Sequence, residues 1–329
     1  MGLFGKKYEN AGAGIAKNAP KKKPFFRFME IFGRKFWKMI GLNILYSIFF
    51  LPLVGAIAVF IMRYNGSMPS GAPTVLLIIG LALLFAIIIG PATAGHTKIL
   101  RAYILEKPVF MVHDFFKTFK NEFKYSCILG FFDCFVAMCI VASLYIYPII
   151  IEHYESKIFY VFFAIALSVG IVVLMMNFYA FLMIIATNLK IKQIMKNSFS
   201  LAIIALKKNI ITLLIISVII GIFVVLIVFA DMSIAVVAMS LLPFIPASWV
   251  GLIMCFNSYP IIQKYIINPY YEQRGEINPE LIGDLGEGAD SEETLFEDMG
   301  GKEKPVETPK KARSKSSGNN SKHKGKIIS

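Results

Sequence analysis

The chain has 329 residues, of which 57% are hydrophobic and 17% are charged, and its mean hydropathy is +0.65. This composition excludes an ordinary soluble domain, in which about 25% of the residues are charged. The apolar residues come in long uncharged runs, and a bilayer core about 30 Å thick needs about 20 such residues per helix. The sequence therefore predicts an all-α, polytopic membrane protein.

The formal net charge of +13 results from the placement of the 34 lysines and arginines. Ten precede the first apolar run, six lie between the second and third runs, and five lie between the fourth and fifth, whereas the alternate connectors hold only Arg63 and Lys157. The positive-inside rule then places both termini and the connectors 98–124 and 188–208 in the cytoplasm. Since topology accounts for the charge, we predict no specific nucleic-acid partner.

The N-terminal region divides into two parts. Residues 1–24 are rich in Gly, Ala, Lys and Asn and lack apolar periodicity, which predicts a disordered basic segment. Residues 25–38 then alternate aromatic and basic side chains at helical spacing. This pattern predicts a helix that lies in the headgroup layer, with Trp37 at its boundary.

Six membrane spans follow, and they form a predicted membrane domain over residues 25–270. We place the spans at 39–62, 74–97, 125–151, 158–187, 209–230 and 243–264. Pro52 falls inside the first span. Residues 232–242 fit either an extension of the fifth span or a short helix in the outer leaflet.

The spans also suggest an internal repeat, in which an interfacial helix followed by a transmembrane hairpin occurs three times. The first two copies share phenylalanines at matching positions, Phe28, Phe32 and Phe36 against Phe115, Phe119 and Phe123. The alternative is that any cytoplasmic connector beside a bilayer becomes basic and aromatic.

The segment 90–125 is predicted to run from the membrane to the cytoplasmic interface and then back into the membrane. Gly90 and Pro91 are predicted to interrupt the second span, and the small residues up to Gly95 leave room for a neighbouring helix. Residues 98–124 are predicted to form one surface-lying helix. Its phenylalanines, including Phe116, would enter the bilayer or the bundle.

Several of these motifs resemble the YesL-like membrane proteins of Gram-positive bacteria. The resemblance rests on residues 36–43, the Leu51-Pro52 pair, the GPATAG stretch at 90–95 and the aromatic, basic run at 114–124. It implies a small multi-span protein of the bacterial plasma membrane with no assigned activity. Related genes often lie near genes for carbohydrate uptake and glycan degradation, which implies a link to carbohydrate utilisation.

Polar residues inside the spans are the best candidates for a functional site, because a polar group in hydrocarbon is costly unless it faces the bundle or water. Asp133 is the one acidic residue well inside a predicted span, about 10 Å from its cytoplasmic end. The same inner half holds Asn43, Thr93, His96, Asn177 and Asn257. We interpret the group either as a cytoplasm-facing polar site around Asp133 or as hydrogen bonds that hold helices together.

Other features predict no catalytic, metal or cofactor site. The four cysteines lie in or beside spans, and the four histidines are scattered without zinc-ligand spacing. The tail 271–329 is acidic at first and then basic, which predicts a disordered cytoplasmic segment. Anionic lipid is a candidate partner of the basic segments, beside the bilayer itself.

The favoured function is therefore a membrane accessory or scaffold protein that works with sugar-transport components, and not an enzyme. The alternative is a transporter, or a transporter subunit, for a sugar or related solute, with a site around Asp133. Three similar hairpins differ from the inverted pair of many transporters, and the connector 191–203 lacks the coupling-loop pattern of an ABC permease.

Overall fold

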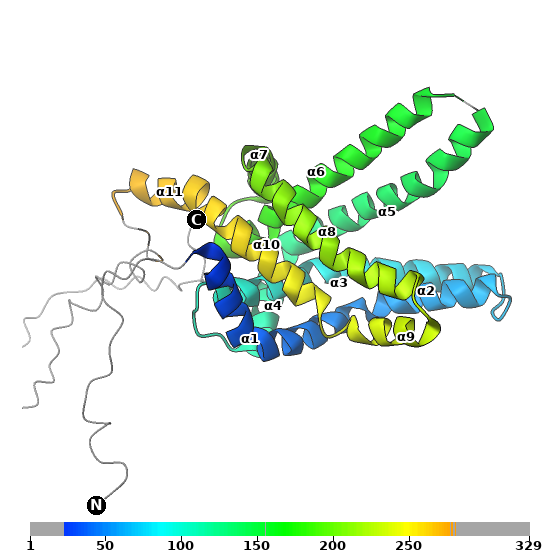
Figure 1. Cartoon of the computed structure of the whole chain (residues 1–329), viewed down its shortest axis with the longest axis horizontal. Helices are drawn as coiled ribbons and strands as arrows, with labels where there is room; N and C mark the ends of the chain where they lie inside the picture. The colour runs from blue at the N-terminus through cyan, green and yellow to red at the C-terminus, as the bar shows by residue number, and fades with distance from the viewer. Residues whose placement is uncertain (1–22, 155, 277, 279, 281–329) are drawn as a thin grey trace, which may run out of the picture.

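The computed structural model describes residues 23–154, 156–276, 278 and 280, and within them the fold is helical without a β-strand (Figure 1). Five helical stretches in this part of the chain are long and apolar enough to cross a membrane, or six if one bent pair is a single span. The all-α membrane class predicted from the sequence is confirmed at this level. The residues 1–22 and 281–329, predicted to be disordered, lie outside the described residues.

The first span and the predicted interfacial helix are one structure. Helix α1 (Pro24–Ser47), the 3₁₀ turn η1 (Ile48–Phe50) and α2 (Leu51–Tyr64) form a stretch of 41 residues. The helix predicted at 25–38 forms the first part of α1 and continues into the span without a break. Its position in the headgroup layer stays a prediction. The only irregularity is η1, which precedes Pro52, whose ring and missing N–H disfavour an uninterrupted α-helix.

Helix α3 (Ala72–Ile104) continues through the predicted interruption. Pro91 lies inside this 33-residue helix and does not end it, so the predicted break was wrong. The small residues act as expected: a Cβ at Gly90 would lie 1.9 Å from the Ser126 carbonyl oxygen. The absence of a side chain at Gly90 therefore permits the close crossing of α3 with α5 (Phe123–Tyr154).

The predicted single helix at 98–124 is divided between two elements. Its first part is about the last two turns of α3, and a short loop leads to α4 (Met111–Asn121). Phe115 on α4 is fully buried, whereas Phe116 and Phe123 are partly exposed. The prediction that aromatic side chains of this segment enter the bundle is confirmed for Phe115.

The remaining helices complete the chain. They are α6 (Ile158–Ala186), α7 (Ile191–Ile204), α8 (Leu206–Val228), α9 (Met232–Leu241), α10 (Pro246–Ile262), the π-helical turn η2 (Gln263–Ile267) and α11 (Asn268–Gln273). Residues 232–241 form a helix of their own, at 55° to the stretch that begins at Pro246. This segment is therefore a short helix and not an extension of α8, and its place in the outer leaflet stays a prediction.

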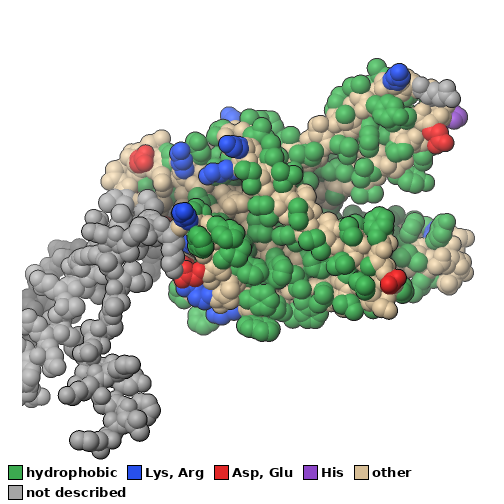
Figure 2. Space-filling model, in the orientation of Figure 1, with side chains coloured by type: hydrophobic (Ala, Val, Ile, Leu, Met, Phe, Trp, Pro, Cys, Tyr) green, Lys and Arg blue, Asp and Glu red, His purple; other side chains and the backbone are tan. Residues whose placement is uncertain are grey.

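The helices pack closely at one end and separate at the other. Figure 1 shows α4, α7, α11 and the start of α1 at the packed end, while the α5–α6 hairpin diverges from α2 and α3 at the opposite end. The buried side chains follow this division, since all nine residues from Phe178 to Ala186 are buried but α5 has buried residues only near its start. In Figure 2, lysines and arginines gather at the packed end, and hydrophobic side chains cover most of the rest of this face, with a few charged side chains at the far end.

Candidate functional site

Asp133 lies at the point where α5 leaves the bundle, and it is paired with α6. The Asn177 side-chain amide donates a hydrogen bond of 2.8 Å to Asp133 Oδ1. Asp133 is half-buried. The predicted contact between Asp133 and one of the polar residues at matching depth is therefore confirmed.

Three of the other predicted residues belong to a second network, which joins α1, α3 and α10. The Asn43 amide group donates 2.8 Å bonds to the carbonyls of Phe244 and Ile245, and Asn43 Oδ1 accepts a 2.6 Å bond from the Ser248 backbone N–H. This N–H is one of those left without a partner at the start of α10, so Asn43 caps α10 from another helix.

His96 and Thr93 continue the same network on α3. His96 Nε2 lies 3.1 Å from the Ser248 hydroxyl, and its ring stacks on Tyr46 at 4.5 Å between centroids. The Tyr46 hydroxyl in turn lies 2.8 Å from Thr93 Oγ1. These contacts fix the position of α10 against α1 and α3.

Asn257, the last predicted site residue, forms a separate contact: its amide donates a 3.0 Å bond to Thr212 Oγ1 on α8. The predicted polar residues thus lie in three groups, one on α5 and α6, one on α1, α3 and α10, and one on α8 and α10. Of the residues proposed to share a site with Asp133, Asn177 bonds to it, whereas Asn43, Thr93 and His96 bond elsewhere. Their side chains face different helices, although their depths match.

The aromatic residues singled out in the sequence pack mainly against other helices. Phe115 and Phe119 contact Phe49 with ring centroids 5.6 and 5.4 Å apart. A Cβ at Gly95 would lie 3.0 Å from the Phe115 carbonyl oxygen, so Gly95 allows α4 to approach α3. Trp37, by contrast, is 80% exposed, as a residue at a membrane boundary would be.

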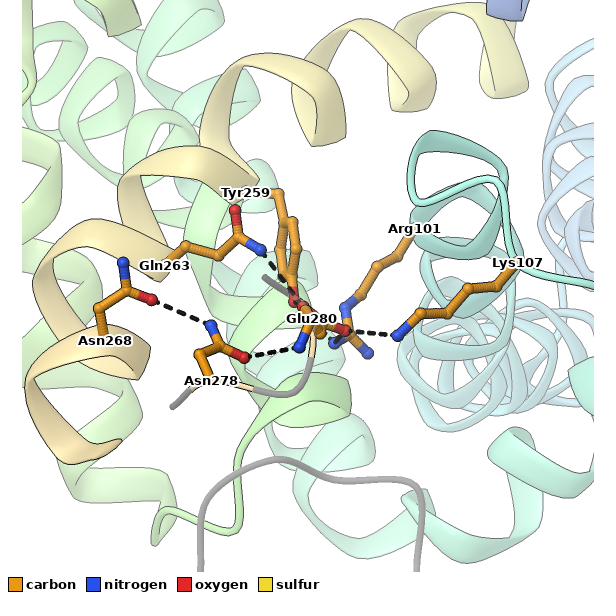
Figure 3. A network of polar contacts seen from close by, with 7 residues as sticks. All are labelled: Arg101, Lys107, Tyr259, Gln263, Asn268, Asn278 and Glu280. Carbon is orange, nitrogen blue, oxygen red and sulfur yellow. Dashed lines mark hydrogen bonds and ion pairs between the residues drawn. The ribbon is translucent and has the colours of Figure 1, made fainter. Parts of the chain in front are cut away.

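A buried charged cluster that the sequence did not predict joins the end of α3 to α10, η2 and Glu280 (Figure 3). Glu280 Oε1 accepts bonds from Arg101 Nη2 at 2.9 Å and from Lys107 Nζ at 3.0 Å. Glu280 Oε2 accepts bonds from the Tyr259 hydroxyl and from Gln263 Nε2, the latter at 3.3 Å. We call these five residues the Glu280 cluster.

Burial and charge make this cluster unusual. The side chains of Arg101 and Glu280 are each only 5% exposed, whereas that of Lys107 is 53% exposed. Burial would raise the pKa of Glu280, but the charge of Arg101 and the hydrogen bonds from Tyr259 and Lys107 outweigh it and lower the pKa below 4.5. Glu280 is therefore ionised at neutral pH.

The C-terminal segment holds Glu280 in place by two further bonds. The Asn278 amide donates a 2.9 Å bond to Asn268 Oδ1, and Asn278 Oδ1 accepts a 3.0 Å bond from the Glu280 N–H. Asn278 and Glu280 therefore contact the helix bundle, although they lie beyond residue 270, where the membrane domain is predicted to end. A buried cation attracts a carboxylate that local composition assigns to solvent.

The sequence indicated that Arg101 is buried, but it did not indicate that Glu280 is its partner. Arg101 lies four and seven residues after Thr97 and Ala94, both buried, so a helix continued past residue 97 would have placed it on the buried face. Glu280 could not be singled out among the ten acidic residues of 272–298.

Comparison with known proteins finds one family. Residues 72–144 match the family described as Protein of unknown function, DUF624. YesL-like proteins belong to this family. The matched region covers α3, α4 and most of α5, and therefore includes the Gly90 crossing, Arg101, Lys107 and Asp133. No curated protein and no solved structure matches the chain.

Within the described residues there is no group of three or more histidines, cysteines or acidic residues that could hold a metal ion. The four cysteines are free, and Cys255 is buried. The candidate sites are thus the Asp133–Asn177 pair and the Glu280 cluster.

Proposed function

We propose that this chain is a YesL-like integral protein of the bacterial plasma membrane, which serves as an accessory or scaffold for sugar-transport components. The link to carbohydrate utilisation rests on the YesL-like resemblance of the sequence. The observation that supports a scaffold most directly is that the predicted polar residues hydrogen-bond to neighbouring helices.

The geometry of these bonds favours packing over solute binding. Asn43 uses both its oxygen and its amide nitrogen to hold the start of α10. Asn177 and Asn257 each donate to a partner on an adjacent helix. Interhelical bonds of this kind are worth about 1 kcal/mol each in membranes, and a donor used in this way is not free to bind a solute.

The α5–α6 hairpin supplies a surface for a membrane partner. Its outer half separates from α2 and α3 (Figure 1) and presents large apolar side chains, such as Val141 at 66% and Val161 at 55% exposure. A partner's transmembrane helices could pack on both sides of this hairpin. We propose membrane subunits of a carbohydrate-uptake system as the partners.

Site-specific photo-crosslinking in native membranes tests this proposal. A photoreactive amino acid at position 141 or 161 should crosslink to a membrane subunit of a carbohydrate-uptake system. The same group at Val218 on α8, which is 63% exposed, is the matched control and should not. Lipid adducts alone at all three positions would contradict the scaffold.

A transporter remains the second candidate, and the half-buried Asp133 beside the diverging hairpin favours it. In proteoliposomes with the full-length protein, this candidate requires uptake of a sugar or related solute that Asp133→Asn abolishes. Asparagine has nearly the same shape as aspartate, so the Asp133→Asn variant should fold whether the protein is a transporter or a scaffold. Uptake lost in Asp133→Asn, with unchanged crosslinking from the hairpin, would favour transport over the scaffold.

A further inference from the structure

The Glu280 cluster has the composition of an anion site built by the helix bundle. Arg101 comes from the end of α3, Lys107 from the loop that follows, Tyr259 from α10 and Gln263 from η2. Each of these side chains donates a hydrogen bond to Glu280 (Figure 3). Four donors from the bundle therefore converge on one carboxylate from the C-terminal segment.

The cluster contains a buried hydrogen-bond donor that the Glu280 carboxylate does not bind. Arg101 Nε is buried and has no hydrogen-bond partner in the described part of the chain, although Arg101 Nη2 bonds to both Tyr259 and Glu280. A guanidinium typically binds a carboxylate or phosphate through two parallel N–H donors. The guanidinium thus offers a buried donor that the carboxylate of Glu280 does not occupy.

The charges are also unequal. Arg101 and Lys107 carry two positive charges against one carboxylate, and Lys98 lies one helical turn before Arg101. A phosphoryl group in its dianionic form would balance Arg101 and Lys107 and would offer three acceptor oxygens in place of two. The π-helical turn that contains Gln263 is of a kind that frequently occurs at functional sites.

Glu280 is held in the cluster by a nearby side-chain hydrogen bond between the C-terminal segment and the bundle. The segment that brings it there bonds to the bundle through Asn278 and Asn268. A ligand tethered in this way acts at an effective concentration in the millimolar range, so a free ligand of moderate affinity can compete with it.

We propose that Arg101, Lys107, Tyr259 and Gln263 form a phosphoryl-binding site at the basic end of the bundle, and that Glu280 occupies this site as an internal ligand until a phosphoryl group displaces it. The phosphoryl group belongs either to a soluble phosphate compound or to a phospholipid headgroup, since the site lies where the helices leave the apolar zone. Binding of the ligand releases Glu280 from the cluster.

Hydrogen exchange on the full-length wild-type protein tests displacement without any mutation. Inorganic phosphate, added to protein in detergent, should increase exchange of the Glu280 amide, which bonds to Asn278 Oδ1, whereas chloride at equal ionic strength should not. In a second arm, nanodiscs of phosphatidylcholine with phosphatidic acid are compared with phosphatidylcholine alone. A response to inorganic phosphate identifies a soluble ligand, and a response to phosphatidic acid alone identifies a lipid headgroup.

Calorimetric titration of variants with inorganic phosphate completes the test. Glu280→Gln removes the competing carboxylate and should tighten phosphate binding by about ten-fold or more. Lys107→Gln in that background should weaken it by about ten-fold, because one charge-assisted contact is lost. Glu276→Gln, an exposed glutamate on the same segment, is the matched control and should change nothing.

Two results would overturn the proposal. The first is unchanged or decreased exchange of the Glu280 amide with both inorganic phosphate and phosphatidic acid. The second is a folded Glu280→Gln variant that binds phosphate no better than the wild type. If this variant does not fold, the exchange experiment on the wild-type protein decides alone.

Discussion

At the basic end of the bundle, the protonation state of one residue, Glu280, affects the stability of the folded protein. Its pKa in the folded protein is below 4.5, because Arg101, Tyr259 and Lys107 stabilise the ionised form against the effect of burial. A lowered folded-state pKa gives a stabilisation that is present above the ordinary pKa and is lost as pH falls through the folded-state value. The pH window of the effect therefore lies below 4.5.

We expect Glu280→Gln to lower the free energy of unfolding by about 2 kcal/mol at pH 7, since hydrogen bonds to a charged group are lost. The difference from the wild type should shrink as pH falls below 4.5, where Glu280 itself becomes protonated. Chemical unfolding of both proteins at a series of pH values measures this difference in the free energy of unfolding. Glu276→Gln, which is exposed, serves as the control. A difference that grows as pH falls below 4.5 would contradict the assignment.

Between elements, the crossing of α3 and α5 depends on two glycines that face each other. A Cβ at Gly90 would lie 1.9 Å from the Ser126 carbonyl oxygen, and one at Gly130 would lie 2.5 Å from the Gly90 Cα. Both obstacles are backbone atoms, which cannot move aside as a flexible side chain can. The crossing is therefore possible only without side chains at these positions.

We expect Gly90→Ala to destabilise the protein by about 1–3 kcal/mol, because the helices must separate to admit the methyl group. Gly80→Ala is the matched control on the same helix, since a Cβ there has nothing within 4 Å. That control should be neutral or slightly stabilising, because alanine is the better helix former. Thermal unfolding in one detergent compares the two, and equal stability of both variants would rule out the close crossing.

In the whole molecule, the basic connectors and the outer loops lie at opposite ends of the helices (Figure 1). α4 and α7 are at the packed end, whereas the α2–α3 and α5–α6 connections are at the far end. Because most of the lysines and arginines of the described residues lie at the packed end, the positive-inside rule predicts that this end is cytoplasmic. The two ends are thus distinguished by charge as well as by packing.

This orientation predicts the outcome of cysteine labelling in intact cells. In a variant with the four native cysteines replaced by alanine, cysteines at Gly66 and Ser156 should react with a membrane-impermeant maleimide. Cysteines at Lys117 and Lys192 should react only after the membrane is opened. Reaction of position 117 or 192 from outside would reverse the orientation.

The sequence predicted the limits of a helix closely where the helix begins and ends together with an apolar run. The span predicted at 158–187 is α6 (Ile158–Ala186), because a helix in hydrocarbon satisfies its backbone internally and its limits follow from local composition. The second span was predicted to end at 97 and continues to Ile104. A charged residue ends an apolar run but does not end a helix.

The partners of the polar residues were decided only by the tertiary structure. Depth along a span can be estimated from the sequence at 1.5 Å per residue, and it correctly placed Asp133 near Asn177. Which helix a side chain faces depends on helix rotation and crossing, so Asn43 was predicted beside Asp133 but bonds to Ser248, 205 residues away. Arg101 and Glu280, 179 residues apart, meet for the same reason: a buried cation requires a carboxylate, and only the folded bundle determines which one can reach it.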